Sequence, residues 1–226
     1  MPLLKTSKAI YAFRLAAVIG AAILLIACTG MPAEPHDYTA FRFSRPRSIL
    51  VLPPVNISTD IKAPMTFLAT SVYPLAESGY YVIPVALSDQ TFKQNGITVA
   101  EEAHAIDYRR LHEIFGADAA LYITILRFGS SYHILSSAVE AEAAARLIDL
   151  RNGQQLWFGA VKVVEQNNSS SGDLLSVLVG AAIDQIANMI SDRAHIVGRK
   201  ATYQLLSAEK EAGILYGPYN PKYGTD

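Results

Sequence analysis

Residues 147–164 read LIDLRNGQQLWFGAVKVV and contain the strongest turn signal of the chain. Asn152-Gly153 separates two apolar runs, and this dipeptide is typical of a tight turn between antiparallel strands. Residues 139–146, upstream of the turn, have helical propensity. Because the hairpin signal follows them so closely, we predict that residues 132–150 instead form one long strand or two short ones.

Two further elements are predicted well upstream of this hairpin. Residues 48–52 are apolar and rich in β-forming types, and Pro53-Pro54 stops the run, which is typical of a buried strand. Residues 63–78 predict a helix, in which Pro74 should cause a kink or a restart.

The next element is a predicted strand at residues 80–87, in which Pro84 marks either the end of the strand or a sheet edge. After a loop at Asn95-Gly96, we predict a helix at 98–115 with a Thr98/Glu101 capping box and with Gly116 at its end. A strand at 119–128 and a turn at Gly129-Ser130-Ser131 then lead to the hairpin.

After the hairpin, a polar loop at residues 167–172 leads to a predicted third helix at 173–192. This helix is uncharged from Leu174 to Ile183 and apolar on nearly all sides, so it should be buried on more than one face. Either a partner subunit or the C-terminal extension would cover the second face, and both options stay open. The candidate interface residues on this helix are Leu175, Val179, Ile183 and Ile186.

The predicted order of elements is β-α-β-α-β-β-β-α. The two crossovers imply parallel pairing early in the chain, and the hairpins imply antiparallel pairing later. We therefore predict an α/β (α+β) fold with a single mixed sheet of about five strands and with helices packed on one or both faces.

The N-terminus has the three zones of an export signal. Lys5, Lys8 and Arg14 are positive, and residues 15–27 are all apolar or Gly, a run shorter than the roughly 20 residues that a spanning helix needs. Leu25-Ile26-Ala27-Cys28 resembles the lipobox of bacterial lipoproteins. Cys28 is the only cysteine, so no intramolecular disulfide can form, and a thioether to lipid accounts for it. We predict a diacylglyceryl group and an N-acyl group such as palmitate on Cys28, and no other cofactor.

The anchor sets the expected organisation and location of the chain. Thr29 follows the lipidated cysteine, and by resemblance to sorted lipoproteins the absence of Asp there favours the outer membrane, with the domain on the periplasmic face. The predicted segments are a signal peptide at residues 1–27, a lipidated terminus and tether at 28–47, an α/β domain at 48–195 and a C-terminal extension at 196–226.

Composition and motifs point away from catalysis and nucleic-acid binding. The net charge is −1 and the pI about 6.5, which gives no basis for binding nucleic acid by bulk charge. The sequence has neither a Gly-rich phosphate loop nor a nucleophile elbow, and its histidines lack metal-binding spacing. These histidines are His36, His104, His112, His133 and His195. Glu140 and Glu142 share one strand face, but two solvent-facing acids explain them more simply than a catalytic carboxylate pair. We predict no catalytic residue, no metal and no enzyme activity.

Residues 215–223 read LYGPYNPKY, an aromatic and proline-rich segment that favours extended or polyproline II structure. Tyr216, Tyr219 and Tyr223 would suit a docking strand for a partner protein. The alternative is that this segment packs back over the core of its own domain. We favour that alternative, because the predicted third helix needs covering.

Four stretches together resemble one protein family. They are ILVLPPVN at residues 49–56, PLAESGYYVIPV at 74–85, FGADA at 115–119 and YGPY at 216–219. The family comprises lipoproteins of Gram-negative bacteria without known function (the DUF799 group). The resemblance implies a fold similar to the N-terminal domain of the translocation protein TolB and to lipoprotein activators of penicillin-binding proteins, and more distantly to the curli-secretion lipoprotein CsgG. It implies no catalytic residue.

These observations predict a non-enzymatic binding or assembly module of a trans-envelope export or cell-wall machine. Its expected partners are membrane lipid, through Cys28, and envelope proteins, and self-association is also expected. The alternative is a ligand-binding or transport-auxiliary lipoprotein that carries a small envelope molecule, which requires a sizeable apolar pocket.

Overall fold

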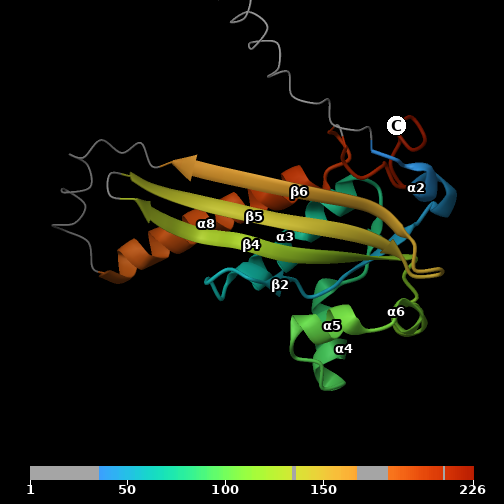
Figure 1. Cartoon of the computed structure of the whole chain (residues 1–226), viewed down its shortest axis with the longest axis horizontal. Helices are drawn as coiled ribbons and strands as arrows, with labels where there is room; N and C mark the ends of the chain where they lie inside the picture. The colour runs from blue at the N-terminus through green and yellow to red at the C-terminus, as the bar shows by residue number, and fades with distance from the viewer. Residues whose placement is uncertain (1–35, 134–135, 167–182, 211) are drawn as a thin grey trace, which may run out of the picture. The chain divides into compact units, whose positions relative to one another are not determined.

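The computed structural model describes residues 36–133, 136–166, 183–210 and 212–226. In chain order the elements are α2 (Thr39–Ser44), β1 (Ser48–Val51), β2 (Val55–Asn56), α3 (Ala63–Glu77), β3 (Tyr81–Val82), α4 (Val85–Gln94), α5 (Ala100–Ala105), α6 (Tyr108–Phe115), β4 (Ala119–His133), β5 (Ser136–Asp149), β6 (Gln155–Gln166) and α8 (Ile183–Leu206), as drawn in Figure 1.

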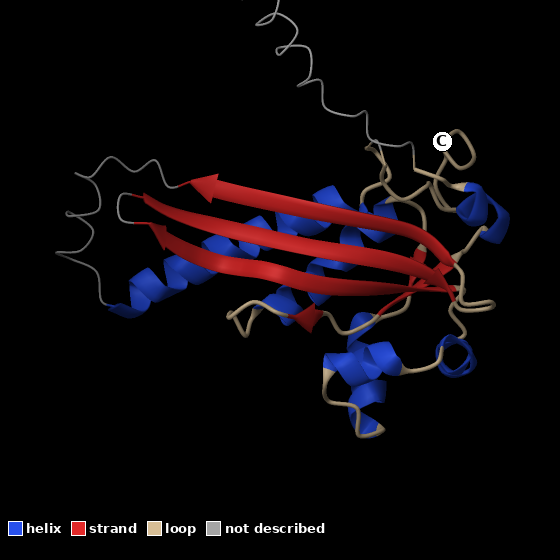
Figure 2. Ribbon diagram, in the orientation of Figure 1, coloured by secondary structure: helices blue, strands red, loops and turns tan. Residues whose placement is uncertain are grey.

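The described strands form one mixed sheet with the order β3-β1-β4-β5-β6, and β2 pairs separately with β4. β1 runs parallel to both β3 and β4, whereas β4, β5 and β6 pair antiparallel in sequence (Figure 2). The early crossovers therefore produce parallel pairs and the later hairpins antiparallel ones. The predicted fold class, a mixed sheet with helices packed against it, is confirmed.

The β5–β6 hairpin forms at the predicted Asn152-Gly153 turn. Gly153 has a φ of +77°, and the Asn152 Oδ1 accepts a hydrogen bond of 2.8 Å from the Gln154 N–H. The region of β5 with helical propensity is a strand, because every second residue enters the core. Ala141 and Ala143 are fully buried there. Cross-strand pairing and burial outweigh the local preference for helix.

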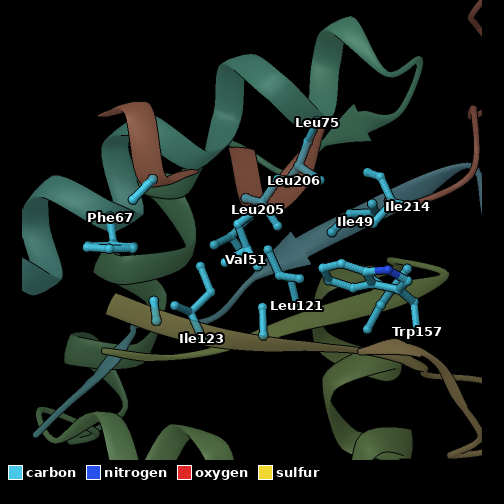
Figure 3. Packing of buried hydrophobic residues seen from close by; sticks show 14 of the residues in the cluster. Ile49, Val51, Phe67, Leu75, Leu121, Ile123, Trp157, Leu205, Leu206 and Ile214 are labelled. Atoms are coloured by element: carbon cyan, nitrogen blue, oxygen red, sulfur yellow. The ribbon is translucent and has the colours of Figure 1, made fainter. Parts of the chain in front are cut away.

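Helices lie on both faces of the sheet. On one face, α3 and α8 cover the main core, and Figure 3 shows its side chains filling the space between helix and strands. The labelled members are Ile49, Val51, Phe67, Leu75, Leu121, Ile123, Trp157, Leu205, Leu206 and Ile214. On the other face, α4, α5 and α6 bury a smaller cluster that includes Leu50, Phe92 and Leu111.

The strand predicted at residues 80–87 is wrong beyond its first residues, since β3 ends at Val82 and α4 begins at Val85. Pro84 has no N–H and therefore cannot continue the ladder to β1. It takes the N-cap position instead, and its carbonyl accepts from the Ser88 N–H at 3.1 Å.

The single helix predicted at residues 98–115 is two helices, α5 and α6. The predicted capping box is wrong, because Val99 is the N-cap of α5 and makes no side-chain cap. Asp107 begins α6, and its carboxylate accepts a hydrogen bond of 2.9 Å from the Arg109 N–H. A good N-cap in the middle of the run divides it. Gly116 ends α6 in the left-handed conformation, as predicted.

The turn predicted at Gly129-Ser130-Ser131 is wrong, because β4 continues through it to His133. Pairing with β5 persists there, with Gly129 opposite Glu140. The pairing of β4 with β5 shifts its register between Ile125 and Arg127, which is the pattern of a β-bulge.

Three further boundaries differ from expectation. α3 is one continuous helix across Pro74, so no restart occurs there. α8 ends at Leu206 rather than at residue 192. Helix α2 lies within the segment expected to be a tether, and its Phe41 is buried. The predicted loop at 167–172 and the start of the third helix lie outside the described residues.

Candidate functional site

The C-terminal segment, residues 212–226, crosses the end of α3 at very close range. The Gly217 N–H donates to the Ser78 carbonyl at 2.7 Å, and the Tyr219 N–H donates to the Gly79 carbonyl at 3.1 Å. A Cβ on Gly217 would lie 2.3 Å from the Gly79 oxygen, so Gly217 cannot carry a side chain here. Two of the sequence stretches that carry the family resemblance are therefore in direct contact.

Three side chains of the domain fasten this segment by hydrogen bonds to its carbonyls. The Tyr80 hydroxyl donates to Leu215 and the Tyr38 hydroxyl to Gly213, each at 2.5 Å. The Trp157 indole N–H donates to Ala212 at 3.0 Å. Burial, together with the nearby Asp226 charge, raises the pKa of Tyr80 well above its ordinary value, which favours the protonated phenol that donates to Leu215. The segment therefore packs on its own domain.

A pocket of about 380 Å³ lies between α2 and this segment, and we call it the tail pocket. Its lining residues are Phe41, Arg42, Arg45, Pro46, Tyr80, Leu215, Tyr216, Tyr223, Gly224 and Asp226. Arg42 Nη2 donates to the Asp226 main-chain oxygen at 3.1 Å, and the Tyr216 N–H donates to the Asp226 carboxylate at 2.5 Å. Lys222 Nζ lies 5.3 Å from the centre of the Tyr216 ring. The tail pocket is thus aromatic, with two arginines and Asp226 in its lining.

Arg45 in this pocket has a strained backbone. It ends α2 with φ +46° and ψ +56°, and its N–H donates to the Phe41 carbonyl at 3.0 Å. Glycine is usual at such a helix end, because the left-handed conformation costs other residues about 1–2 kcal/mol. The Arg45 Nε donates only to the Arg42 carbonyl, at 3.2 Å, and forms no ion pair among the described residues. Arg45 thus combines a strained backbone with few side-chain contacts, and strained residues cluster at functional sites.

Asp149 holds α2 in place. Its side chain is 2% exposed and accepts hydrogen bonds from the Ser44 hydroxyl at 2.7 Å and from the Arg151 guanidinium at 2.7 and 2.9 Å. Burial alone would raise the pKa of Asp149, but the hydrogen bonds from Arg151 and Ser44 outweigh burial and hold that pKa below its ordinary value. The charged carboxylate therefore joins the end of α2 to the β5–β6 hairpin.

The structure brings together two of the predicted interface residues, Tyr216 and Tyr223, in the tail pocket. Tyr219 lies on the same segment and is 68% exposed. For Ile183 and Ile186 only the backbone, in α8, is described. The other candidates, Leu25, Ile26, Ala27, Cys28, Leu175 and Val179, lie outside the described residues.

Sequence reasoning missed Arg42 and Arg45, because it assigned them to the tether. The signal available was the cluster of three arginines in RFSRPR at residues 42–47. These arginines come close to Tyr216 and Tyr223 only because the C-terminal segment folds back onto α2. The Arg42–Asp226 hydrogen bond, for example, joins residues that are 184 positions apart in the chain. No local pattern reports such a contact.

The other candidate groups make structural contacts. Within the described ranges, no three His, Cys, Asp or Glu side chains are placed to hold a metal ion. His104 Nε2 is 3.0 Å from the Pro53 carbonyl, and burial lowers its pKa. Glu140 and Glu142 share one strand face as predicted, and both lie within 4.0 Å of Arg127.

No helix in the described part of the chain is both long enough and apolar enough to cross a bilayer.

Comparison with known proteins agrees with the family resemblance. Residues 36–219 match the family model described as "Putative lipoprotein GNA1162-like". A relative from Neisseria meningitidis serogroup B, "Putative lipoprotein NMB1124/NMB1162", is 47% identical over 200 residues, which are 88% of this chain and 93% of the relative.

The fold also matches solved structures. The crystal structure of lipoprotein GNA1162 from Neisseria meningitidis is 50% identical, with a TM-score of 0.53 over 63% of this chain and 99% of that one. The PelC dodecamer of Paraburkholderia phytofirmans is 10% identical, with a TM-score of 0.42 over 71% of this chain and 86% of that one. The PelC likeness is too weak to carry a functional argument.

Proposed function

The chain belongs to the GNA1162-like family of lipoproteins, and from that premise we propose that it is an outer-membrane lipoprotein that works by binding envelope proteins. In this proposal Cys28 carries the lipid, and the domain faces the periplasm. The domain has no catalytic role and serves as a docking or assembly part of a trans-envelope export or cell-wall machine. Anchoring by several acyl chains is stable, whereas a single chain holds only marginally.

The observation that carries this proposal is the chemistry of the tail pocket. Tyrosine and arginine are among the residue types most enriched at the energetic centres of protein interfaces, where a few side chains supply most of the binding energy. Arg42, Arg45, Tyr216 and Tyr223 meet here around a cavity of about 380 Å³. The partner feature that fits is an extended, acidic protein segment with an apolar residue to fill the cavity.

The charged side chains at the pocket indicate which charge the partner segment carries. Arg42 already donates to Asp226, and Lys222 lies over the Tyr216 ring. Arg45 is therefore the cation that is available to a carboxylate of the partner. An arginine presents a planar fork of donors, which suits bidentate contact with a carboxylate.

The experiment is photo-crosslinking in intact cells that produce the full chain. A photo-crosslinking amino acid replaces Tyr219, which is 68% exposed next to the pocket. We expect one defined protein adduct, and its yield should fall about tenfold in Arg45→Ala and in Tyr223→Ala backgrounds. The control places the same crosslinker at Leu87, which is 59% exposed on α4.

An adduct that forms equally from Leu87, or that survives both pocket substitutions, would count against the tail pocket as the docking site. The absence of any protein adduct from position 219 would count against the binding function itself.

Self-association belongs to the same proposal. The sequence from Leu174 to Ile183 is uncharged and is predicted to be helical, and apolar surfaces are common interfaces between subunits. Light scattering of the purified protein should therefore show a mass above that of one chain. A strict monomer at high concentration would remove this part of the proposal.

A further inference from the structure

A second site lies on the solvent side of helices α3 and α8, away from the tail pocket. The two helices pack closely where they face each other. A Cβ on Gly198 of α8 would lie 2.7 Å from the Thr66 side chain of α3, and Ala201 is fully buried. Outside this contact runs a groove of about 620 Å³. We call it the helix groove.

The lining of the helix groove is mainly apolar. α3 contributes the Ala69 methyl and the Pro74 ring, and the Tyr73 and Tyr203 rings face the same groove from the two helices. Both tyrosines are exposed, Tyr73 by 63% and Tyr203 by 43%. The volume of the groove and its aromatic, mainly apolar lining fall within the range of sites that bind small molecules.

The threonine hydroxyls in and beneath the groove already have hydrogen-bond partners. The Thr70 hydroxyl donates to the Thr66 carbonyl at 2.7 Å, and the buried Thr202 hydroxyl donates to Thr70 at 3.0 Å. These groups therefore require no polar partner from a ligand. The body of an occupant should be apolar.

One charged side chain in the lining of the helix groove, Arg199, is suited to bind an anionic group of the occupant. Lys200 Nζ is paired with the Glu165 carboxylate, and the Tyr203 hydroxyl donates to Glu209 at 3.3 Å. Arg199 lines the groove as well, and its guanidinium has no ion pair within the described part of the chain. A guanidinium beside an apolar surface binds a carboxylate or phosphate head strongly.

We propose that the helix groove binds a single-chain lipid with an anionic head. The alkyl chain lies against Tyr73, Pro74 and Tyr203, and the head contacts Arg199. A lipoprotein that carries a small molecule needs an apolar pocket, and the helix groove would supply one. The proposal does not depend on the tail pocket.

The test uses the purified full chain in phosphatidylcholine nanodiscs and a diazirine-bearing palmitate as the probe. After illumination, mass spectrometry of tryptic peptides locates the adducts. We expect them on the peptides that contain Tyr73 and Tyr203, residues 63–93 and 201–210. The methyl ester of the same probe, which lacks the charge, should label these peptides about tenfold less.

Two substitutions and one control sharpen the result. Arg199→Ala should lower labelling by the acid about tenfold and leave labelling by the ester unchanged. Ala69→Trp fills the groove from an exposed helix position and should remove labelling by both probes. Arg110→Ala removes a surface arginine from α6, whose side chain is 70% exposed, and should change nothing.

Competition with unlabelled lipids identifies the head group and the fit of the chain. Palmitate and lysophosphatidylglycerol separate a carboxylate from a phosphodiester head. Each pair of methylenes removed from the competitor should weaken it roughly tenfold while the chain is buried, since one buried methylene contributes about 0.8 kcal/mol. Equal labelling by acid and ester, labelling that persists in Ala69→Trp, or no competition by either lipid would overturn the proposal.

Discussion

Replacing Arg45 by glycine separates the binding role of this residue from its structural role. Arg45 ends α2 at φ +46°, where its own Cβ is unfavourable and a glycine is not. The substitution removes the available cation from the tail pocket and at the same time relieves backbone strain. We therefore expect lost binding without lost stability.

The expected stability change follows from three contributions of similar size. Relief of the left-handed strain adds about 1–2 kcal/mol to the free energy of unfolding. The greater freedom of glycine in the unfolded chain removes about 0.5–1 kcal/mol. The exposed hydrogen bond from Arg45 to the Arg42 carbonyl, at 3.2 Å, contributes about 0.5 kcal/mol, which is also lost. The net change in the free energy of unfolding is therefore between about −0.5 and +1 kcal/mol.

Two measurements on the same variant test this reasoning. Urea unfolding followed by tryptophan fluorescence reports the free energy of unfolding through Trp157, the single tryptophan. Crosslinking from position 219 in cells reports partner binding, which should fall about tenfold. Arg47→Ala is the matched control, because Arg47 is 73% exposed, lies 4.0 Å from Asp118 and does not line the pocket.

A fall of more than 2 kcal/mol in the free energy of unfolding would refute the assignment of strain to Arg45. Crosslinking that stays within twofold of the unsubstituted protein would refute its role in binding. Loss of crosslinking in the Arg47→Ala control would show that general positive charge, rather than the tail pocket, attracts the partner.

Three further outcomes are expected. Gly159→Ala should lower the free energy of unfolding by about 1–3 kcal/mol in urea titrations, because its Cβ would lie 2.2 Å from the Trp157 ring; an unchanged value would contradict this packing. Asp149 stabilises the fold at pH values above its unfolded-state pKa, near 3.8, and this contribution is lost as the pH falls through its lower folded-state pKa. In the Asp149→Asn variant, the free energy of unfolding should therefore fall less steeply as the pH is lowered below about 4. An unchanged pH dependence would show that Asp149 is not the source of this loss of stability. Cys28→Ala should give an unprocessed or soluble protein in membrane fractionation, whereas a processed, membrane-bound variant would exclude lipid on Cys28.

The parts of the fold that could be predicted from sequence are those specified by a few neighbouring residues. Asn152-Gly153 set the hairpin, and Gly116 ended α6, because both turns need particular backbone conformations that few residue types adopt. The errors came where two local signals competed. Asp107 divided a helix that looked continuous, and pairing with β5 carried β4 through Gly129. The Asp107 cap lies within the predicted helix and was overlooked, whereas the strand residue opposite Gly129, Glu140, lies outside the window that the prediction used.

The candidate site likewise contains residues that the sequence identified and residues that it did not. The tyrosines at positions 216, 219 and 223 were identified as candidates because they stand together in one segment. Arg45 was not, since its side chain becomes informative only next to the C-terminal segment. The helix groove could not be predicted at all, because it depends on how close α3 and α8 approach each other.

The sequence alone was enough to place the strand before Pro53-Pro54 and the hairpin turn, and it is also the basis for the predicted export signal and lipobox ending at Cys28. Peptide-bond geometry and the identity of neighbouring residues are enough for these. Only the tertiary structure decided that α2 meets the C-terminal segment and that two helices leave a groove between Tyr73 and Tyr203. These arrangements arise from burying apolar area shared by distant segments, and that free energy depends on the whole fold rather than on any one stretch of the chain.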